Sequence, residues 1–470
     1  MAHVRLFRHY IHLPFVILGL IDFIVMALAF ALAVFFRFFG EVGFFVENLL
    51  FIILSVIAFS LFNLIVMIAL GVHQASVEEG MSGMMLRTIM AMILAIPVHG
   101  FAYFVADDWL WYLGSFGLLT SATVLSIFSL GITRVLFFAL VGNEAFKRRV
   151  LVLGAGHRAR QLLEDLTTPF NRKGFTMAGF VPLPDEPIEI ADEHLINLPT
   201  SLHEYVLRHP VREIVVAVDD RRRGLPMEDL LECKMEGVQI IDGANFYERE
   251  SRKVALEMIT RGWLVFSDGF TVSSVYGIGK RTLDIFSAGL LLLATFPIML
   301  LTALAIKLED GLKSPVLYSQ ERVGLNNRVF RVHKFRSMVT DAEKHGAVWA
   351  KKNDSRVTRV GEFIRKVRID ELPQIFNVLN GTMAFVGPRP ERPIFVEQLS
   401  EKIPFYAERH RVKPGLTGWA QLCFAYADNE EDTREKLRYD LYYIKNQSLL
   451  LDLLVIIQTV EVVLFKKGSR

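Results

Sequence analysis

Four long apolar stretches fill the first third of the chain, at residues 11–36, 46–71, 84–105 and 109–140. Each has at least the ~20 residues that a helix needs to cross a bilayer. Backbone groups in lipid must be hydrogen-bonded within their own segment, so these stretches predict helices. The mean hydropathy of +0.36, which is high for a soluble protein, also indicates that a large part of the chain lies in a membrane.

Basic residues beside the apolar stretches predict their orientation. Arg5 and Arg8 precede the first stretch, Arg87 lies near the second connection, and three basic residues at 147–149 follow the fourth stretch. Because basic loops stay in the cytoplasm, we expect the N-terminus and everything after residue 147 to be cytoplasmic. The first apolar run is too long for a secretory signal peptide, so we expect no cleavage there.

Residues 146–270 change character and predict an α/β domain. Three short β-rich runs are separated by helical patterns, which indicates a doubly wound parallel sheet with a Rossmann-like fold. Gly154 and Gly156 give only the first half of a dinucleotide-binding fingerprint, because Ala159 stands where the third glycine belongs. A nucleotide site and a non-catalytic regulatory or assembly role both stay open for this domain.

A fifth apolar segment, residues 282–308, combines spanning length with two features that oppose a simple span. Lys280 and Arg281 lie at one end and Lys313 lies beyond the other, so both ends should be cytoplasmic. Pro297 lies in the middle, where it removes a backbone donor and kinks a helix. We expect a re-entrant helix that enters and leaves on the same side, with a fifth span as the alternative.

The last apolar run covers residues 448–467. Asp452, Gln458 and Glu461 interrupt it. Charged side chains are costly inside a bilayer, so this run predicts a helix in the membrane interface rather than one that spans the membrane.

The stretch 364–381 predicts a short helix that follows a pair of adjacent carboxylates. Pro373 fits the first turn of that helix, and Gly381 fits its end. Asp370 would then lie near the helix N-terminus, where backbone N–H groups stabilise an anion. The predicted apolar face of this helix contains Leu372, Ile375, Phe376 and Leu379.

The adjacent carboxylates allow two interpretations. Asp370 serves only as a helix cap, or it takes part in chemistry. Glu371 would point elsewhere, so the two groups could have separate roles. Arg365 and Arg368 lie within reach of a phosphate bound beside Asp370.

Three further segments present cations suited to phosphate. Arg322 belongs to one of them, Lys334 and Arg336 would share a strand face in the second, and a proline-rich loop presents Arg389 in the third. Together, beside a kinked membrane helix, they indicate an anionic substrate at the membrane surface. The formal net charge is only +2, so the sequence gives no reason to expect a nucleic-acid partner.

Six motifs occur in order between residues 280 and 467, and together they are a specific signal. This segment resembles the bacterial sugar transferase family of monotopic phosphoglycosyl transferases. The helices and the middle domain resemble its long form, the polyprenyl glycosylphosphotransferases of exopolysaccharide, capsule and O-antigen assembly. The motifs are Lys280-Arg-x-x-Asp284, the segment with Pro297, Lys334-Phe-Arg-Ser-Met, Asp370-Glu-Leu-Pro-Gln, Val386-Gly-Pro-Arg-Pro and Lys413-Pro-Gly-Leu-Thr-Gly-Trp-Ala-Gln.

The resemblance implies three parts. A transmembrane α-helical bundle would occupy residues 1–145, a Rossmann-like α/β cytoplasmic domain residues 146–270, and an α/β monotopic catalytic domain residues 275–470, with the re-entrant membrane helix at 282–308. The protein would be a multi-pass protein of the bacterial inner membrane whose catalytic domain faces the cytoplasm. A homodimer is among the implied assemblies.

The resemblance also implies a reaction. Asp370 matches the family's nucleophile, which attacks the β-phosphate of a UDP-sugar, releases UMP and carries the phosphosugar until polyprenyl (undecaprenyl) phosphate accepts it. Glu371 matches its dyad partner, and Mg²⁺ is the implied cofactor, with Asp370 as its expected ligand. Two positions differ from the usual pattern: Phe296 precedes Pro297 where many members have serine, and Arg368 replaces a small residue.

Two other functions are compatible with parts of the sequence. A membrane-anchored, NAD-dependent nucleotide-sugar dehydratase or epimerase would account for the glycine loop and for Tyr276-x-x-x-Lys280. That pattern belongs on a helix, and its two internal glycines should each disfavour the helix by about 1 kcal/mol. A non-enzymatic export scaffold would give no role to Asp370 and Glu371. The sequence does not indicate the donor sugar.

Overall fold

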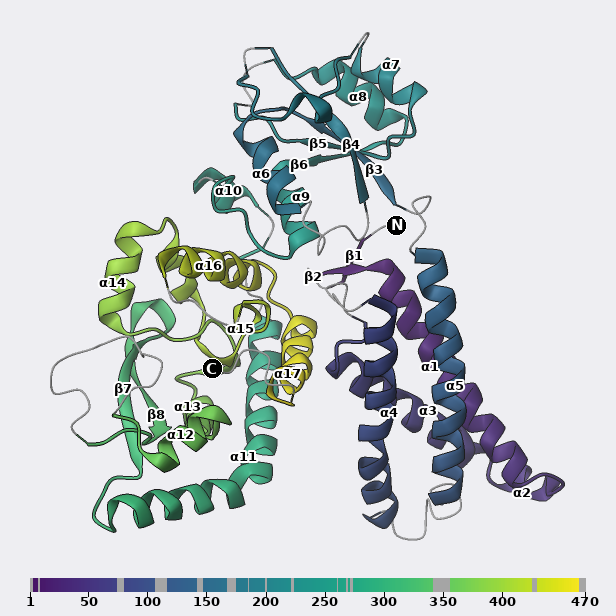
Figure 1. Cartoon of the computed structure of the whole chain (residues 1–470), viewed down its shortest axis with the longest axis vertical. Helices are drawn as coiled ribbons and strands as arrows, with labels where there is room; N and C mark the ends of the chain where they lie inside the picture. Colours follow the sequence, from purple (N-terminus) through teal and green to yellow (C-terminus); the bar gives the residue numbers. More distant parts are fainter. Residues whose placement is uncertain are drawn as a thin grey trace. The chain divides into compact units, whose positions relative to one another are not determined.

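The computed structural model describes residues 3–6, 9–73, 80–105, 116–141, 147–166, 175–184, 186–198, 201–220, 224–259, 261–267, 269–270, 274–340, 356–424 and 429–464. The chain forms two compact units, Met1–Arg261 and Gly262–Arg470. The first contains a helical bundle and an α/β domain, and the second contains the predicted active-site residues (Figure 1).

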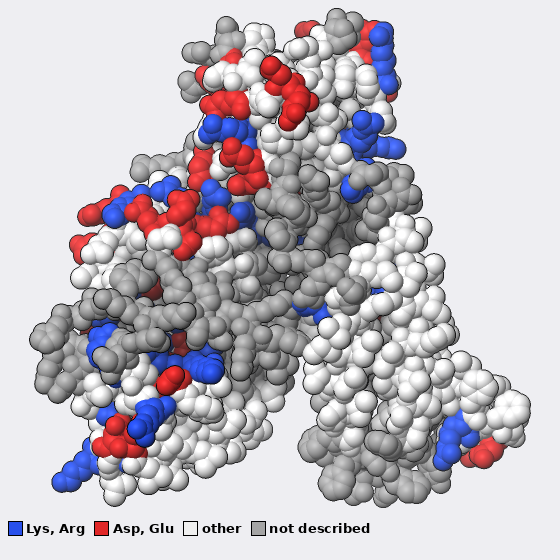
Figure 2. Space-filling view, in the orientation of Figure 1, with Lys and Arg blue, Asp and Glu red and all other residues white. Residues whose placement is uncertain are grey.

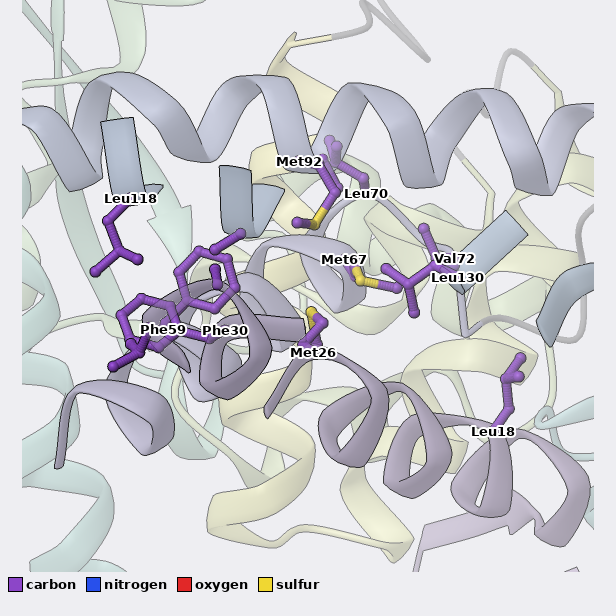
Figure 3. Close-up of a cluster of buried hydrophobic side chains, with 14 of the residues drawn as sticks. Leu18, Met26, Phe30, Phe59, Met67, Leu70, Val72, Met92, Leu118 and Leu130 are labelled. Atoms are coloured by element: carbon purple, nitrogen blue, oxygen red, sulfur yellow. The ribbon is translucent and has the colours of Figure 1, made fainter. Parts of the chain in front are cut away.

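The bundle consists of the helices that the four apolar stretches predict. Their buried side chains form one apolar cluster, which includes Met26, Phe30 and Phe59 (Figure 3). A short antiparallel hairpin precedes the bundle, and the sequence does not predict it. The elements are β1 (His3–Leu6), β2 (His9–His12), α1 (Leu13–Arg37), α2 (Val42–Glu47), α3 (Leu49–Ala69), α4 (Gly80–Val105) and α5 (Phe116–Val141).

Three bundle segments are long and apolar enough to cross a membrane: Val16–Arg37, Leu49–Ala69 and Gly117–Leu140. The apolar segment found in α4 is shorter, Gly83–Pro97, so length alone does not identify α4 as a span. In the view of Figure 2 the described residues on the bundle surface include almost no charged side chains, apart from a small group near α2. Such a surface suits contact with lipid, where an exposed charge is costly.

One charged cluster lies inside the bundle. The Arg134 guanidinium in α5 donates to both carboxylate oxygens of Asp22 in α1, over 2.9 and 2.7 Å, and neither side chain is exposed. A ring nitrogen of His73 lies 2.7 Å from Asp22, and Arg134 Nε donates to Thr88 Oγ1 over 3.2 Å. A two-pronged guanidinium–carboxylate contact has a fixed geometry, so this cluster sets the register of α1 against α5.

The middle part is the predicted α/β domain, with a sheet of four parallel strands in the order β4-β3-β5-β6. Strand β4 is the element that the sequence does not predict. Whether this domain is Rossmann-like in the nucleotide-binding sense stays a prediction. The elements are β3 (Arg148–Leu153), α6 (His157–Leu166), β4 (Phe175–Val181), η2 (Asp192–His194), α7 (Leu202–Arg208), β5 (Glu213–Val216), α8 (Met227–Met235), β6 (Gln239–Asp242) and α9 (Gly243–Ser251).

The second unit combines helices with two small sheets, antiparallel β7–β8 and parallel β9–β10. A short helix, α10 (Arg261–Phe266), precedes the long helix α11. The other elements are α11 (Ser274–Asp310), β7 (Leu317–Val323), η3 (Leu325–Asn327), β8 (Val329–Phe335), α12 (Arg359–Lys366), η4 (Ile369–Glu371), α13 (Gln374–Asn380), β9 (Ala384–Val386), α14 (Pro393–Lys402), η5 (Tyr406–Arg411), β10 (Gly415–Thr417), α15 (Trp419–Cys423), α16 (Glu430–Lys445) and α17 (Leu449–Leu464).

Helix α11 contains Pro297 and bends sharply between its two halves (Figure 1). It is apolar enough to cross a membrane, and many of its leucines are exposed, including Leu293 and Leu308. In its second half the opposite face packs Met299 and Ile306 into a cluster with residues of β8 and α12. The helix therefore supports the candidate site on one face and offers an apolar surface on the other. The re-entrant passage through a membrane stays a prediction.

Candidate active site

The Glu371 carboxylate joins three segments of the second unit. Its Oε1 accepts a hydrogen bond from Lys334 Nζ in β8 over 2.8 Å and another from Arg389, in the loop after β9, over 2.6 Å. Burial acts to raise the pKa of Glu371, but Arg389 and Lys334 outweigh burial and hold this pKa well below its usual range. Glu371 is therefore ionised at neutral pH and fixes two cations beside Asp370.

Asp370 lies in the same turn with the opposite electrostatic balance. Burial and the neighbouring Glu371 carboxylate raise the pKa of Asp370 to about 6, although Lys334, Arg365 and Arg389 act to lower it. No hydrogen bond or ion pair joins its carboxylate to another residue that the structure describes. Two adjacent carboxylates with pKa values pushed apart are suited to different roles. Asp370 is the more basic of the two carboxylates, and Glu371 is the one held by ion pairs.

A left-handed residue creates the turn that carries both carboxylates. Arg368 has φ 57° and directly precedes the 3-10 turn η4. This backbone conformation costs a residue with a Cβ roughly 1–2 kcal/mol. The turn ends α12 and separates it from α13, so Asp370 and Glu371 lie between two helices rather than within one.

Helix α13 begins later than its sequence predicts. It starts at Gln374 and ends at Asn380, and Gly381 follows with φ 85°, as predicted. Asp370 lies before this helix and makes no capping hydrogen bond in η4 or α13. The interpretation of Asp370 as a helix cap is therefore wrong.

The predicted apolar face of α13 is wrong in part. Ile375 is buried, but Phe376 is 45% exposed, and Asn377 is buried in its place. The Asn377 amide donates to the carbonyl of Arg331 over 2.8 Å, and its oxygen accepts from the His333 N–H over 3.1 Å. These bonds tie α13 to β8 and compensate the burial of a polar side chain.

The predicted phosphate-binding cations divide into two groups. Lys334 and Arg389 contact Glu371 directly, and Arg365 lies close enough to lower the pKa of Asp370. Arg322 in β7 donates to the carbonyl of Pro390, next to Arg389, over 3.1 Å. These four residues gather around the two carboxylates.

The sequence predicts that Arg336 shares a strand face with Lys334, and the structure shows that it does not. Strand β8 ends at Phe335, and the Arg336 guanidinium is buried against Asp310 at the end of α11, over 2.6 Å. Its position indicates that Arg336 fixes α11 to the sheet.

The two basic residues at the start of α11 face inward, although the sequence places them at the membrane interface. Arg281 donates to the carbonyls of Val378 and Leu379 at the C-terminal end of α13, over 2.7 and 2.6 Å. A cation is stabilising at that end of a helix. Lys280 donates to the carbonyl of Val386 over 3.0 Å. Both residues connect the apolar helix to the site.

A magnesium site built from protein side chains alone is not found. The described residues contain no group of three or more His, Cys, Asp or Glu side chains that could hold a metal ion. Mg²⁺ is commonly bound by one or two carboxylates together with substrate phosphates. The Asp370 carboxylate, beside Lys334, Arg365 and Arg389, fits that shared arrangement.

The comparisons with known proteins identify the family of the chain. Residues 275–466 match the family model described as bacterial sugar transferase. A relative from Xanthomonas campestris, named UDP-glucose:undecaprenyl-phosphate glucose-1-phosphate transferase, is 30% identical over 336 residues, which cover 68% of this chain and 68% of that protein. The chain belongs to the bacterial sugar transferase family.

Two further members of the family are more similar over shorter regions. The UDP-N-acetylgalactosamine-undecaprenyl-phosphate N-acetylgalactosaminephosphotransferase of Aeromonas hydrophila is 51% identical over 198 residues, 42% of this chain and 46% of that protein. The undecaprenyl-phosphate glucose phosphotransferase of Komagataeibacter xylinus is 44% identical over 196 residues, 40% of this chain and 36% of that protein. The chain therefore covers less than half the length of these two relatives.

The NAD-dependent alternative meets a structural obstacle in the middle domain. The N-terminus of α6, where a dinucleotide fold holds its pyrophosphate, is occupied by the Asp219 carboxylate. Asp219 accepts hydrogen bonds from the N–H groups of His157 and Arg158, each over 2.9 Å, and Glu186 accepts one from Ala155 over 3.1 Å. A phosphate there would meet two carboxylates, which favours the non-catalytic interpretation of this domain.

The Tyr276-x-x-x-Lys280 pattern does lie on a helix, contrary to the expectation from its glycines. Both residues belong to α11, and their polar atoms contact Asp452 of α17. The pattern thus serves packing within the second unit.

Sequence reasoning missed a buried charged cluster behind Arg389. Arg409 donates to the carbonyl of Arg389 over 3.0 Å and to Asp440 over 2.8 Å. A cavity of about 40 Å³ lies beside it. No sequence signal links these residues, because they come from separate elements. The cavity is lined by Glu391, Phe395, Leu399, Tyr406, Arg409, Thr433, Lys436, Leu437 and Asp440.

Proposed function

We propose that this protein transfers a phosphosugar from a UDP-sugar to polyprenyl (undecaprenyl) phosphate and releases UMP. Membership of the bacterial sugar transferase family supports this activity, and the names of the three relatives include the same acceptor. The observation that carries the proposal is the pair of adjacent carboxylates with opposite pKa shifts, Asp370 and Glu371, surrounded by four cations.

In the first step the Asp370 carboxylate attacks the β-phosphorus of the UDP-sugar. A bond forms between its oxygen and that phosphorus, and the bond to the oxygen shared with the α-phosphate breaks, so UMP leaves with the electron pair. In the second step a phosphate oxygen of the polyprenyl carrier attacks the same phosphorus and displaces Asp370. The product is a polyprenyl diphosphate sugar, and the carboxylate is regenerated.

The chemistry fits the properties of each carboxylate. With a pKa of about 6, Asp370 is largely ionised at neutral pH and yet more basic than an ordinary aspartate, which favours nucleophilic attack. Glu371 stays ionised and holds Lys334 and Arg389, whose remaining N–H groups can bind phosphate oxygens. Mg²⁺, held by Asp370 and the substrate phosphates, would supply further charge neutralisation.

The same proposal accounts for the apolar helices. The acceptor is a membrane lipid and the donor is water-soluble, so the site must lie at a bilayer surface. We place the protein in the bacterial inner membrane, with several spans in the bundle and α11 as a re-entrant helix. The three basic residues at 147–149, which follow the last bundle helix, favour a catalytic domain on the cytoplasmic side.

Purified protein in lipid nanodiscs, supplied with polyprenyl phosphate, Mg²⁺ and single UDP-sugars, tests the proposal. Release of UMP and formation of the lipid-linked sugar are the readouts. UDP-N-acetylgalactosamine and UDP-glucose come first among the donors, because the relatives' names include these sugars.

Omitting the lipid acceptor separates the two steps. We then expect no more than one UMP per protein and a phosphosugar adduct on the peptide that contains Asp370. UMP release that requires the acceptor from the first turnover, with no adduct, would contradict the two-step mechanism.

A further inference from the structure

The loop that carries Arg389 is held by its carbonyl groups. Pro388 and Pro390 have no N–H to donate, so the loop cannot hold itself by regular backbone pairing. Other elements donate to its carbonyls instead. The Pro388 carbonyl accepts from the Gly415 N–H over 2.9 Å, that of Arg389 from Arg409 over 3.0 Å, and that of Pro390 from Arg322 over 3.1 Å.

The Val386 carbonyl, at the end of β9 directly before this loop, accepts a hydrogen bond from Lys280 Nζ of α11 over 3.0 Å. The Tyr443 hydroxyl of α16 lies 3.1 Å from the same carbonyl oxygen, but its single proton goes to Asp452, which is the nearer acceptor. Lys280 and Tyr443 both contact this one carboxylate. Asp452 of α17 accepts from Lys280 over 3.1 Å and from Tyr443 over 2.6 Å.

Asp452 is fully buried, and its partners among the described residues are Lys280, Tyr443 and Tyr276, which donates to it over 2.9 Å. Burial and the Asp452 charge raise the pKa of Tyr443, which keeps its hydroxyl protonated and able to donate. Removing one partner from a buried charge is far more costly than removing an exposed one. The contacts among Asp452, Lys280 and Tyr443 therefore form a rigid group.

A shift at Val386 would be passed on to Arg389. Only Gly387 and Pro388 separate the two residues. Pro388 has a fixed φ, and Gly387 packs so closely that a Cβ atom there would lie 2.4 Å from the Lys413 carbonyl oxygen. Neither residue can absorb a displacement by rotating freely. Arg389 in turn contacts Glu371 over 2.6 Å.

We propose that Asp452, held by Tyr443 and acting through Lys280, is a positioning residue of the transfer reaction, because it fixes the donor to the Val386 carbonyl and thereby sets Arg389 against Glu371. This inference rests on the proposed function. It gives the C-terminal helix α17 a role in the chemistry, although Asp452 touches no reacting atom. Lys280 then serves the active site as well as the start of the apolar helix.

The test uses the full-length protein in nanodiscs. Asp452→Asn removes the charge with little change in shape, and Tyr443→Phe removes only the hydroxyl. Thr459→Val is the matched control on α17, because Thr459 Oγ1 lies 2.8 Å from Thr417 Oγ1 and does not contact the Arg389 loop. Each variant is also combined with Arg389→Ala, or with Arg389→Gln where the alanine variant falls below detection.

We expect Asp452→Asn and Tyr443→Phe each to lower kcat for UMP release by about tenfold with little change in KM, since the lost alignment matters most in the transition state. In the Arg389 variant the same changes should lower kcat less than about twofold, because the group they position is already gone. Thr459→Val should leave kcat within about twofold of the unmodified protein in both backgrounds.

Equal losses with and without Arg389 would overturn the inference, because a purely structural role adds independently of Arg389. No loss in either single variant would overturn it as well. If Asp452→Asn does not fold, Tyr443→Phe alone decides by the same comparison. If the unmodified protein releases no UMP from any donor, the proposed function itself fails, which is distinguishable from a failure of the positioning role.

Discussion

Replacing Asp370 by asparagine should abolish transfer and, at the same time, stabilise the fold. The two effects share one cause. Burial and the adjacent Glu371 carboxylate make the ionised form of Asp370 unfavourable in the native state, which raises its pKa from 3.8 to about 6. Asparagine has nearly the same shape and carries no charge, and the Asp370 carboxylate has no hydrogen-bond partner among the described residues to lose.

The sign of the effect follows from proton binding. Between about pH 4 and pH 6 the native state binds more protons at Asp370 than the unfolded state, so the contribution of Asp370 to stability falls as pH rises through this range and is level above it. Each pKa unit corresponds to about 1.4 kcal/mol, so the ionised carboxylate costs the native state on the order of 3 kcal/mol at neutral pH. Asp370→Asn removes the charge and should therefore raise the free energy of unfolding by part of this amount, which is measurable as a rise of several degrees in melting temperature.

The assay compares melting temperatures in detergent with EDTA, so that no metal ion compensates the charge. Glu371→Gln is the matched control, because the pKa of Glu371 is lowered and its ionised form stabilises the fold. We expect Asp370→Asn to melt higher at pH 7.5 and equally near pH 4, and Glu371→Gln to melt lower at pH 7.5. An Asp370→Asn protein that melts at or below the unmodified protein at pH 7.5 would refute this reasoning, and transfer above a few per cent would refute the nucleophile assignment.

Three other outcomes test the remaining parts of the structure. In a Cys423→Ser background, Gly277→Cys and Lys313→Cys at the two ends of α11 should label from the same side of the membrane, and labelling from opposite sides would exclude the re-entrant helix. A chain that begins at Gly262, the first residue of the second compact unit, should still release UMP when folded in membranes, and a folded but inactive chain would place part of the active site earlier. Burial and then Arg409 lower the pKa of His410 to about 4, so the contribution of His410 to stability should fall by up to about 3 kcal/mol as pH drops from 6.5 to 4, which is opposite in sign to the contribution of Asp370. His410→Phe should remove this contribution from the pH dependence of the thermal melts.

The sequence predicted the parts of this fold that depend on local pattern. The apolar bundle helices, the parallel α/β sheet and the helix end at Gly381 all follow from periodicity and from glycine chemistry. The predicted apolar face of α13 is wrong where contacts with another element override the helical periodicity. Asn377 is buried because β8 offers it a carbonyl and an N–H, and Phe376 is exposed as a result.

In the site, too, the sequence predicts what depends on local pattern and misses what depends on tertiary contacts. Asp370 and Glu371 stand out as a sequence pair, but the ion pairs of Glu371 join residues 37 and 18 positions away, and no local signal gives them. Asp452 was interpreted as an interruption of an apolar helix, which predicted an interfacial position. In the folded chain it is buried against Lys280, 172 positions earlier, so the interruption marks a tertiary contact.

The Asp22–Arg134 pair has a consequence for how the bundle is made. Asp22 is synthesised 112 residues before its partner, and it lies within the apolar segment Val16–Arg37, where an unpaired charge in lipid is costly. Helix α1 should therefore stay at a protein-lined insertion site, or at the bilayer surface, until α5 emerges from the ribosome. The first and last helices of the bundle would then enter the lipid together. A chain that stalls before Arg134 is made would leave the Asp22 carboxylate without its guanidinium partner.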